Sequence, residues 1–141
     1  MKTRIIVAIV ILLTALPIAA QYAPEPKRDR LDSAPMAFRT FFAKFRNAVE
    51  KKDKTQVAAM TRFPFAYGYD AGDEGKYTRT QFLKHFKDVT GDFFGEYKMD
   101  KNPWFERGDD QSYTISTESA SHLTFIRSCS TFKFISYYVE P

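Results

Sequence analysis

The spacing of apolar residues changes along this chain, and that change limits the folds it can adopt. Apolar side chains recur every three or four residues in 36–60 and 78–91, as they do on the buried side of an amphipathic helix. They recur at every second residue in 63–69 and again through 112–140, which is the period of a strand with one buried face. Helices around one strand, followed by consecutive antiparallel strands, predict an α+β domain.

The first helical stretch carries one continuous apolar stripe. Its members are Phe38, Phe41, Phe42, Phe45 and Val49. Ser33 is expected to cap this helix, with Pro35 in its first turn. A second, short helix is expected to begin at Asp53 and to end before Pro64, which disfavours helical geometry in the residue before it.

The stretch "FPFAYGYD", residues 63–70, places four aromatic side chains on one face of a strand. They are Phe63, Phe65, Tyr67 and Tyr69. Such a face can be simple core or the wall of a ligand pocket, and the spacing alone leaves both open. The tyrosines are the better pocket candidates, because a buried phenol hydroxyl needs a hydrogen-bond partner. "AGDEGK", which follows, is expected to be a polar turn.

A third helix is predicted over 78–91, "TRTQFLKHFKDVTG". Thr78 and Gln81 have the spacing of a capping box. Phe82, Phe86 and Val89 form its buried stripe, and Gly91 suits its end.

Five strands are predicted after this helix. They lie around residues 98 and 105 and over 112–117, 122–127 and 131–140. In the last strand, Phe132, Phe134 and Tyr138 are expected on one face, and Ile135, Tyr137 and Val139 on the other. Apolar groups on both faces require a cover for the second one, either another part of the chain or a second copy. Ile135, Tyr137 and Val139 are therefore a candidate homodimer interface.

The N-terminus has the layout of a secretory signal peptide. Lys2 and Arg4 precede an uncharged apolar run, 5–16, which Pro17 interrupts before small residues. We expect cleavage near Ala20 and export to the periplasm or the cell exterior. An uncleaved anchor is the alternative, although the run is shorter than the about 20 residues that a membrane span needs. The expected segments are a signal peptide 1–20, a flexible leader 21–32 and a single domain 33–141.

The net charge and the reactive side chains argue against several classes of function. The net charge of +4 falls to +2 when Lys2 and Arg4 are removed with the signal peptide. The sequence has no stripe of basic residues, so we expect no binding of nucleic acid. The single cysteine, Cys129, has no partner for an internal disulfide, and we expect a loop or buried thiol. Neither His85 nor His122 has the spacing of a metal site. With no phosphate-binding glycine loop and no serine elbow, we expect no cofactor and no metal.

The order and apolar spacing of 36–140 resemble the nuclear transport factor 2-like superfamily, which includes ketosteroid isomerases and polyketide cyclases. The resemblance is carried by "FFAKFRNAVEKKDKTQVAAM", "YTRTQFLKHF" and "FKFISYYVEP". It implies a cone in which three N-terminal helices pack inside a curved antiparallel sheet, with a pocket between the concave face and the first and third helices. The ligand-binding candidates are Tyr67, Tyr69, Phe65, Phe42 and Trp104.

The same resemblance bears on catalysis. In the isomerases a carboxylate near the end of the first strand is the general base, and Asp70 lies at a comparable place. The first helix, however, has no tyrosine to stabilise an oxyanion. The sequence therefore predicts an exported binding or accessory domain for an apolar ligand or an envelope protein. The alternatives are an isomerase, cyclase or dehydratase that uses Asp70, and a structural dimerisation module.

Overall fold

The computed structural model describes residues 28–69, 72–94, 100–117 and 120–140. The expected signal peptide, most of the expected leader, Asp70 and the strand expected around residue 98 lie outside the described residues and stay predictions. The described fold begins earlier than expected, because Asp29–Arg30 already pairs with a strand of the sheet.

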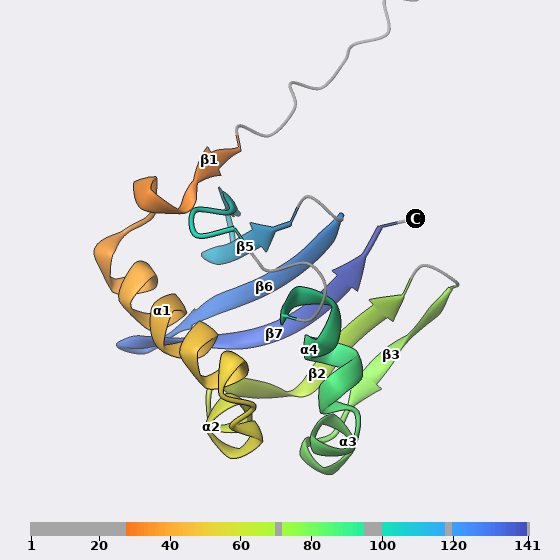
Figure 1. The fold of residues 1–141 in the computed structure, drawn as a ribbon. Coiled ribbons are helices and arrows are strands. Elements are labelled where there is room, and N and C mark those ends of the chain that lie inside the picture. Colours follow the sequence, from red (N-terminus) through yellow and green to blue (C-terminus); the bar gives the residue numbers. More distant parts are fainter. Residues whose placement is uncertain (1–27, 70–71, 95–99, 118–119, 141) are drawn as a thin grey trace, which may run out of the picture.

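The described chain folds into one curved, unclosed sheet with its helices on one side (Figure 1). The helices are α1 (Met36–Glu50), α2 (Lys54–Ala59), α3 (Arg79–Lys84) and α4 (Phe86–Phe94), preceded by the 3₁₀ turn η1 (Leu31–Ser33). The strands are β1 (Asp29–Arg30), β2 (Thr61–Tyr69), β3 (Asp73–Tyr77), β4 (Trp104–Arg107), β5 (Ser112–Ser116), β6 (Ser121–Ser128) and β7 (Thr131–Val139).

The seven strands follow the order β1-β4-β5-β6-β7-β2-β3. This arrangement confirms the α+β prediction. The expectation of a wholly antiparallel sheet is wrong, because β2 pairs with β7 in parallel. No hairpin joins those two strands, so their connection does not impose the antiparallel direction.

The first two helices lie where the apolar spacing predicts them, but one cap differs. Ser33 lies in η1, where its hydroxyl donates to the Arg30 carbonyl at 2.7 Å. Pro35 occupies the N-cap position of α1 instead, with no side-chain cap. Asp53 caps α2 as expected, because its carboxylate accepts a hydrogen bond from the Gln56 amide at 2.9 Å.

The single helix expected over 78–91 is two helices. The capping box of Thr78 and Gln81 is present at the start of α3. The helix ends at His85, whose backbone has φ −94° and ψ 19°, and α4 then continues past Gly91. The expected buried stripe is confirmed, since Phe82, Phe86 and Val89 are at most 3% exposed.

The polar segment after β2 is a strand where a turn was expected. β3 pairs with β2 as an antiparallel hairpin, in which Gly75 lies opposite Tyr67. Most of its side chains are exposed. An edge strand of this kind is held mainly by backbone hydrogen bonds on one side, so it lacks the apolar alternation that reveals a buried strand.

A bulge in β7 reverses the expected faces of its second half. Thr124 pairs with Ser136 while the next residue, Phe125, pairs with Phe134, so Ile135 is an extra residue in β7. One extra residue moves all later side chains to the opposite face. Tyr137 is consequently fully buried and Val139 packs against the core, whereas Tyr138 is exposed. Ile135, Tyr137 and Val139 were expected to share the face opposite Phe132 and Phe134. This expectation is wrong for Tyr137 and Val139, which face the core.

The core is a cluster of aromatic rings between α1 and the sheet. Phe125 of β6 lies edge-on to Phe41, Phe42 and Phe45, with centroids 5.8, 5.7 and 5.1 Å away. It is completely buried. Within the described ranges, the helices are all too short or too polar to cross a bilayer.

Phe125→Ala is expected to lower the free energy of unfolding by about 3–5 kcal/mol, because it removes a buried ring and leaves a cavity among the α1 rings. Denaturant unfolding followed by circular dichroism measures this. Met36→Ala is the control, since Met36 is 69% exposed at the start of α1. A loss for Phe125→Ala no larger than that of the control would contradict the prediction.

Candidate functional site

The aromatic face of β2 divides into two halves. Phe63 and Phe65 lie edge-on to Phe82 of α3, at 5.5 and 5.0 Å between centroids. Phe65 also contacts Phe134 at 4.7 Å and is completely buried. Phe65 is therefore core, and Phe63 is half-buried against it.

The other half of the strand belongs to a group of four tyrosines, Tyr67, Tyr69, Tyr77 and Tyr137, called here the tyrosine cluster. Tyr67 stacks on Tyr77 of β3 with centroids 4.0 Å apart and an interplanar angle of 16°. Tyr69 meets Tyr67 at 5.5 Å and Tyr137 at 5.8 Å. This half of the aromatic face is also filled by rings.

A histidine and a carboxylate adjoin the tyrosine cluster. The imidazole of His85 stacks on Tyr77 at 5.0 Å and 3°. Its Nδ1 lies 3.0 Å from a carboxylate oxygen of Asp88. The break between α3 and α4 falls at His85, so the same local feature that divides the helix also places this imidazole against β3.

The hydroxyl of Tyr69 is the unusual polar group of the cluster. Its oxygen is buried and has no hydrogen-bond partner among the described residues. Burial raises the pKa of Tyr69 above its ordinary value, and the neighbouring Tyr77 and Asp88 act in the same direction. Burial likewise raises the pKa of Tyr77, with Tyr67 the next cause. Tyr69 is therefore held in its neutral phenol form.

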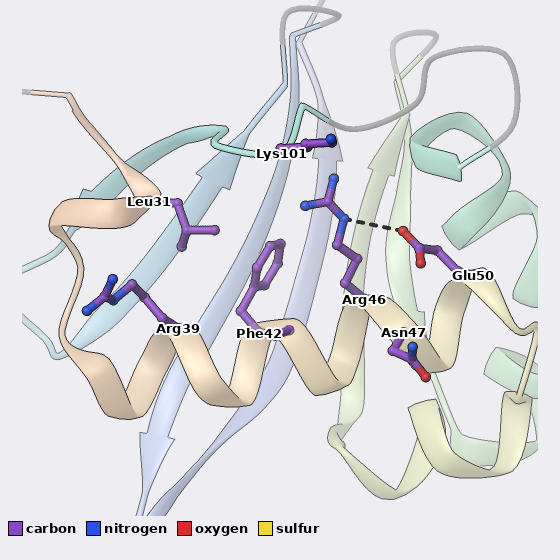
Figure 2. Close-up of a pocket in the computed structure, with 8 residues that line it drawn as sticks. Leu31, Arg39, Phe42, Arg46, Asn47, Glu50 and Lys101 are labelled. Atoms are coloured by element: carbon purple, nitrogen blue, oxygen red, sulfur yellow. Dashed lines mark ion pairs between the residues drawn. The ribbon is translucent and has the colours of Figure 1, made fainter.

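A pocket of about 220 Å³ lies along α1, and we call it the Phe42 pocket. Figure 2 shows the ring of Phe42 and the side chain of Leu31 pointing into it, with charged side chains at both ends. The lining residues are Leu31, Arg39, Phe42, Ala43, Arg46, Asn47, Glu50 and Lys101.

A second pocket, called here the Phe41 pocket, lies on another side of α1. Its volume is about 280 Å³. It is lined by Ala37, Thr40, Phe41, Lys44, Met60, Thr131, Phe132 and Lys133. Because both pockets use exposed residues of the same helix, the Phe41 pocket offers matched control positions for the Phe42 pocket.

The candidate ligand residues are not brought together at one site. Phe42 lines a pocket, whereas Tyr67 and Tyr69 lie in the tyrosine cluster and Phe65 lies in the core. Trp104 is apart from them, half-buried beside the guanidinium of Arg30, whose carbon is 3.8 Å from the ring centroid. Its chain neighbour Phe105 is the one that points into the core.

Sequence reasoning missed most residues of the Phe42 pocket. Leu31 lies in a segment expected to be a flexible leader, although its amide donates to the Pro103 carbonyl at 3.0 Å. Arg39, Arg46 and Glu50 lie on the polar side of α1, for which the sequence analysis predicted no site. The spacing of Arg46 and Glu50 at i and i+4 was the available signal, and they form an ion pair at 3.4 Å.

Among the residues that the structure describes, the remaining reactive side chains lie apart from one another. His122 has its Nδ1 2.8 Å from the Ser116 hydroxyl, while its Nε2 lies 3.1 Å from a Glu140 carboxylate oxygen without hydrogen-bond geometry. Ser116 of β5 is only 6% exposed and lies opposite His122 of β6, so this contact joins neighbouring strands. Cys129 is exposed after β6, in agreement with a loop thiol. Among the described residues, no three His, Cys, Asp or Glu side chains are placed to bind a metal ion.

Comparison with known proteins finds similarity to solved structures only. No family model matches the chain, and no curated protein matches it. The structure of Aln2 from a Streptomyces species matches with a TM-score of 0.51 at 14% identity, covering 74% of this chain and 87% of Aln2. A likeness at this identity establishes a shared fold and does not extend to activity.

Two further structures match less closely. ActVI-ORFA from Streptomyces coelicolor has a TM-score of 0.44 at 14% identity, covering 70% of this chain and 90% of its own. An NTF2-like protein of unknown function from Pseudomonas putida has a TM-score of 0.43 at 13% identity, covering 71% of this chain and 80% of its own.

Tyr69→Phe is expected to reduce the loss of stability at alkaline pH. Burial raises the pKa of Tyr69 in the folded chain above 10, so the unfolded chain ionises first as the pH rises. The contribution of Tyr69 is therefore complete below about pH 10 and is lost as the pH rises above that value. Denaturant unfolding at successive alkaline pH values measures the slope.

Tyr138→Phe is the matched control for this test, because it removes a hydroxyl from a ring that is 41% exposed. Identical pH profiles for the two variants would show that the buried hydroxyl of Tyr69 has no special part in alkaline stability.

Proposed function

Because the chain has the nuclear transport factor 2-like fold, we propose that it is a small ligand-binding domain whose Phe42 pocket takes an apolar molecule. The fold does not specify an activity, so the proposal depends on the pocket itself. Concave sites with an apolar wall and a few convergent polar groups are the usual form of small-molecule sites. The Phe42 pocket has that form, with Leu31, Phe42 and Ala43 as its apolar part.

The position of the Phe42 ring is the observation that carries this proposal. The ring is 1% exposed and packs against Phe38, Phe45 and Phe125 at 6.0, 6.4 and 5.7 Å between centroids. The ring is therefore part of the core, and only its edge lines the pocket. A wall fixed in this way loses little freedom when a ligand binds, which favours affinity.

The opposite wall is also fixed before binding. Leu31 is 9% exposed, and its backbone is tied to the Pro103 carbonyl. The volume of about 220 Å³ is smaller than the about 300–1,000 Å³ of pockets for drug-sized ligands. We therefore expect a ligand smaller than a typical cofactor, bound by one apolar portion.

We also propose that the domain works outside the cytoplasm, after cleavage near Ala20. The motivation is the charged, apolar and small-residue order of the first twenty residues. Mass spectrometry of the protein purified from its native host measures the mature N-terminus. A mature chain that begins at Gln21 supports export, and one that retains residues 1–20 would support an uncleaved anchor or a cytoplasmic protein.

Ala43→Phe is expected to abolish binding of 1-octanol, a neutral apolar probe, because the new ring would occupy the Phe42 pocket. The measurement is the change in backbone amide NMR shifts of α1 on titration, fitted for saturation. Ala37→Phe is the control, since Ala37 is exposed on the same helix but lines the Phe41 pocket.

Two outcomes would contradict the proposal. One is the absence of saturable shifts in the unsubstituted protein. The other is an unchanged titration of Ala43→Phe, which would place the probe elsewhere on the molecule.

A further inference from the structure

The ends of the Phe42 pocket carry an excess of positive charge. Its lining includes three cations, Arg39, Arg46 and Lys101, and one carboxylate, Glu50. Figure 2 shows Arg39 at one end beside Leu31, and Arg46 and Lys101 near each other at the other, with the Phe42 ring between them. An apolar centre with cationic ends suits a ligand that is apolar along its length and anionic at a terminus.

One of these cations is already engaged by the protein. The Nε of Arg46 pairs with Glu50 at 3.4 Å, and its Nη2 donates to the Asp100 carbonyl at 2.8 Å. The carboxylate of Asp100 in turn lies 3.3 Å from Arg30. The nearby acids are therefore engaged with arginines other than Arg39.

Arg39 and Lys101 are left with unused donors. The Nε of Arg39 is buried without a hydrogen-bond partner in the described part of the chain. Its Nη2 reaches the sulfur of Met36 at 3.8 Å, and a thioether is a weak acceptor. Lys101 is exposed and forms no ion pair within the described residues. A buried donor without a partner costs free energy while the pocket is empty. An acceptor that enters the pocket and takes this hydrogen bond removes that cost.

We infer that the Phe42 pocket binds a short-chain or medium-chain monocarboxylate, with its carboxylate on Arg39 or Lys101 and its chain over Ala43 and the edges of Phe42 and Leu31. This inference rests on the proposed binding function and names its ligand class. A carboxylate accepts from a guanidinium N–H in a short charge-assisted bond. A single negative charge matches the few unused donors, and the small volume matches a short apolar chain.

The experiment compares sodium octanoate with 1-octanol, which have the same chain length and differ in charge. Isothermal titration calorimetry on the protein as purified from its native host gives both dissociation constants. Octanoate is expected to bind about tenfold more tightly or better, the usual effect of a hydrogen bond to a charged group. Raising the salt concentration should weaken the binding of octanoate and leave the binding of octanol unchanged.

Two variants assign the effect to the pocket. Arg39→Met and Lys101→Met each remove a charge and keep an unbranched side chain, and at least one should reduce the preference for octanoate severalfold. Lys44→Met is the control, because Lys44 is an exposed cation of α1 that lines the Phe41 pocket. Lys101 is itself exposed, so its replacement leaves the core unchanged.

The outcomes separate this inference from the proposed function. Equal affinity for octanoate and octanol, or a preference that survives both pocket variants, overturns the inference and leaves the binding function intact. Failure of both compounds to bind overturns the two together. A preference lost in a pocket variant and kept in Lys44→Met supports the monocarboxylate site.

Discussion

The packing of α1 rings on the rings of β6 and β7 is the interaction on which the rest of the fold depends. Phe45 lies 5.1 Å from Phe125 and 5.0 Å from Phe134, and all three are essentially buried. With one cysteine in the chain, no internal disulfide can support the fold. Its stability therefore comes from the burial of apolar surface, and edge-on ring contacts add to that burial.

This constraint explains why the pocket lies where it does. One side of α1 is committed to the core, and a ligand site can form only where that side ends and the polar side begins. Phe42 lies at this border, with its ring in the core and its edge in the pocket. The polar neighbours Arg39 and Arg46 follow from helical spacing at i−3 and i+4. A site of this kind combines a rigid apolar wall with charges that solvent can reach.

The period of the apolar residues was sufficient to predict the α+β class, the first two helices and five strands, because burial of one face imposes that period directly. It could not predict the bulge at Ile135, since an extra residue leaves the sequence equally apolar while it exchanges Tyr137 and Tyr138 between faces. It also could not predict β3, which is held by backbone pairing. Most of the Phe42 pocket was missed because charged residues of α1 resemble a solvated face.

The aromatic strand "FPFAYGYD" shows why ring spacing alone does not predict a binding site. Alternation correctly indicates that four rings share a face, but rings from other elements occupy the space in front of them. Phe82 covers the phenylalanines, and Tyr77 covers Tyr67 from a strand that sequence reasoning did not predict. The feature that distinguishes a pocket from core is an incompletely matched surface, such as an unpartnered donor beside an apolar wall. The Tyr69 hydroxyl is also unpartnered, but it lies against the rings of Tyr67 and Tyr137, whereas Arg39 adjoins a measurable volume beside Phe42, and this is why we place the ligand on α1.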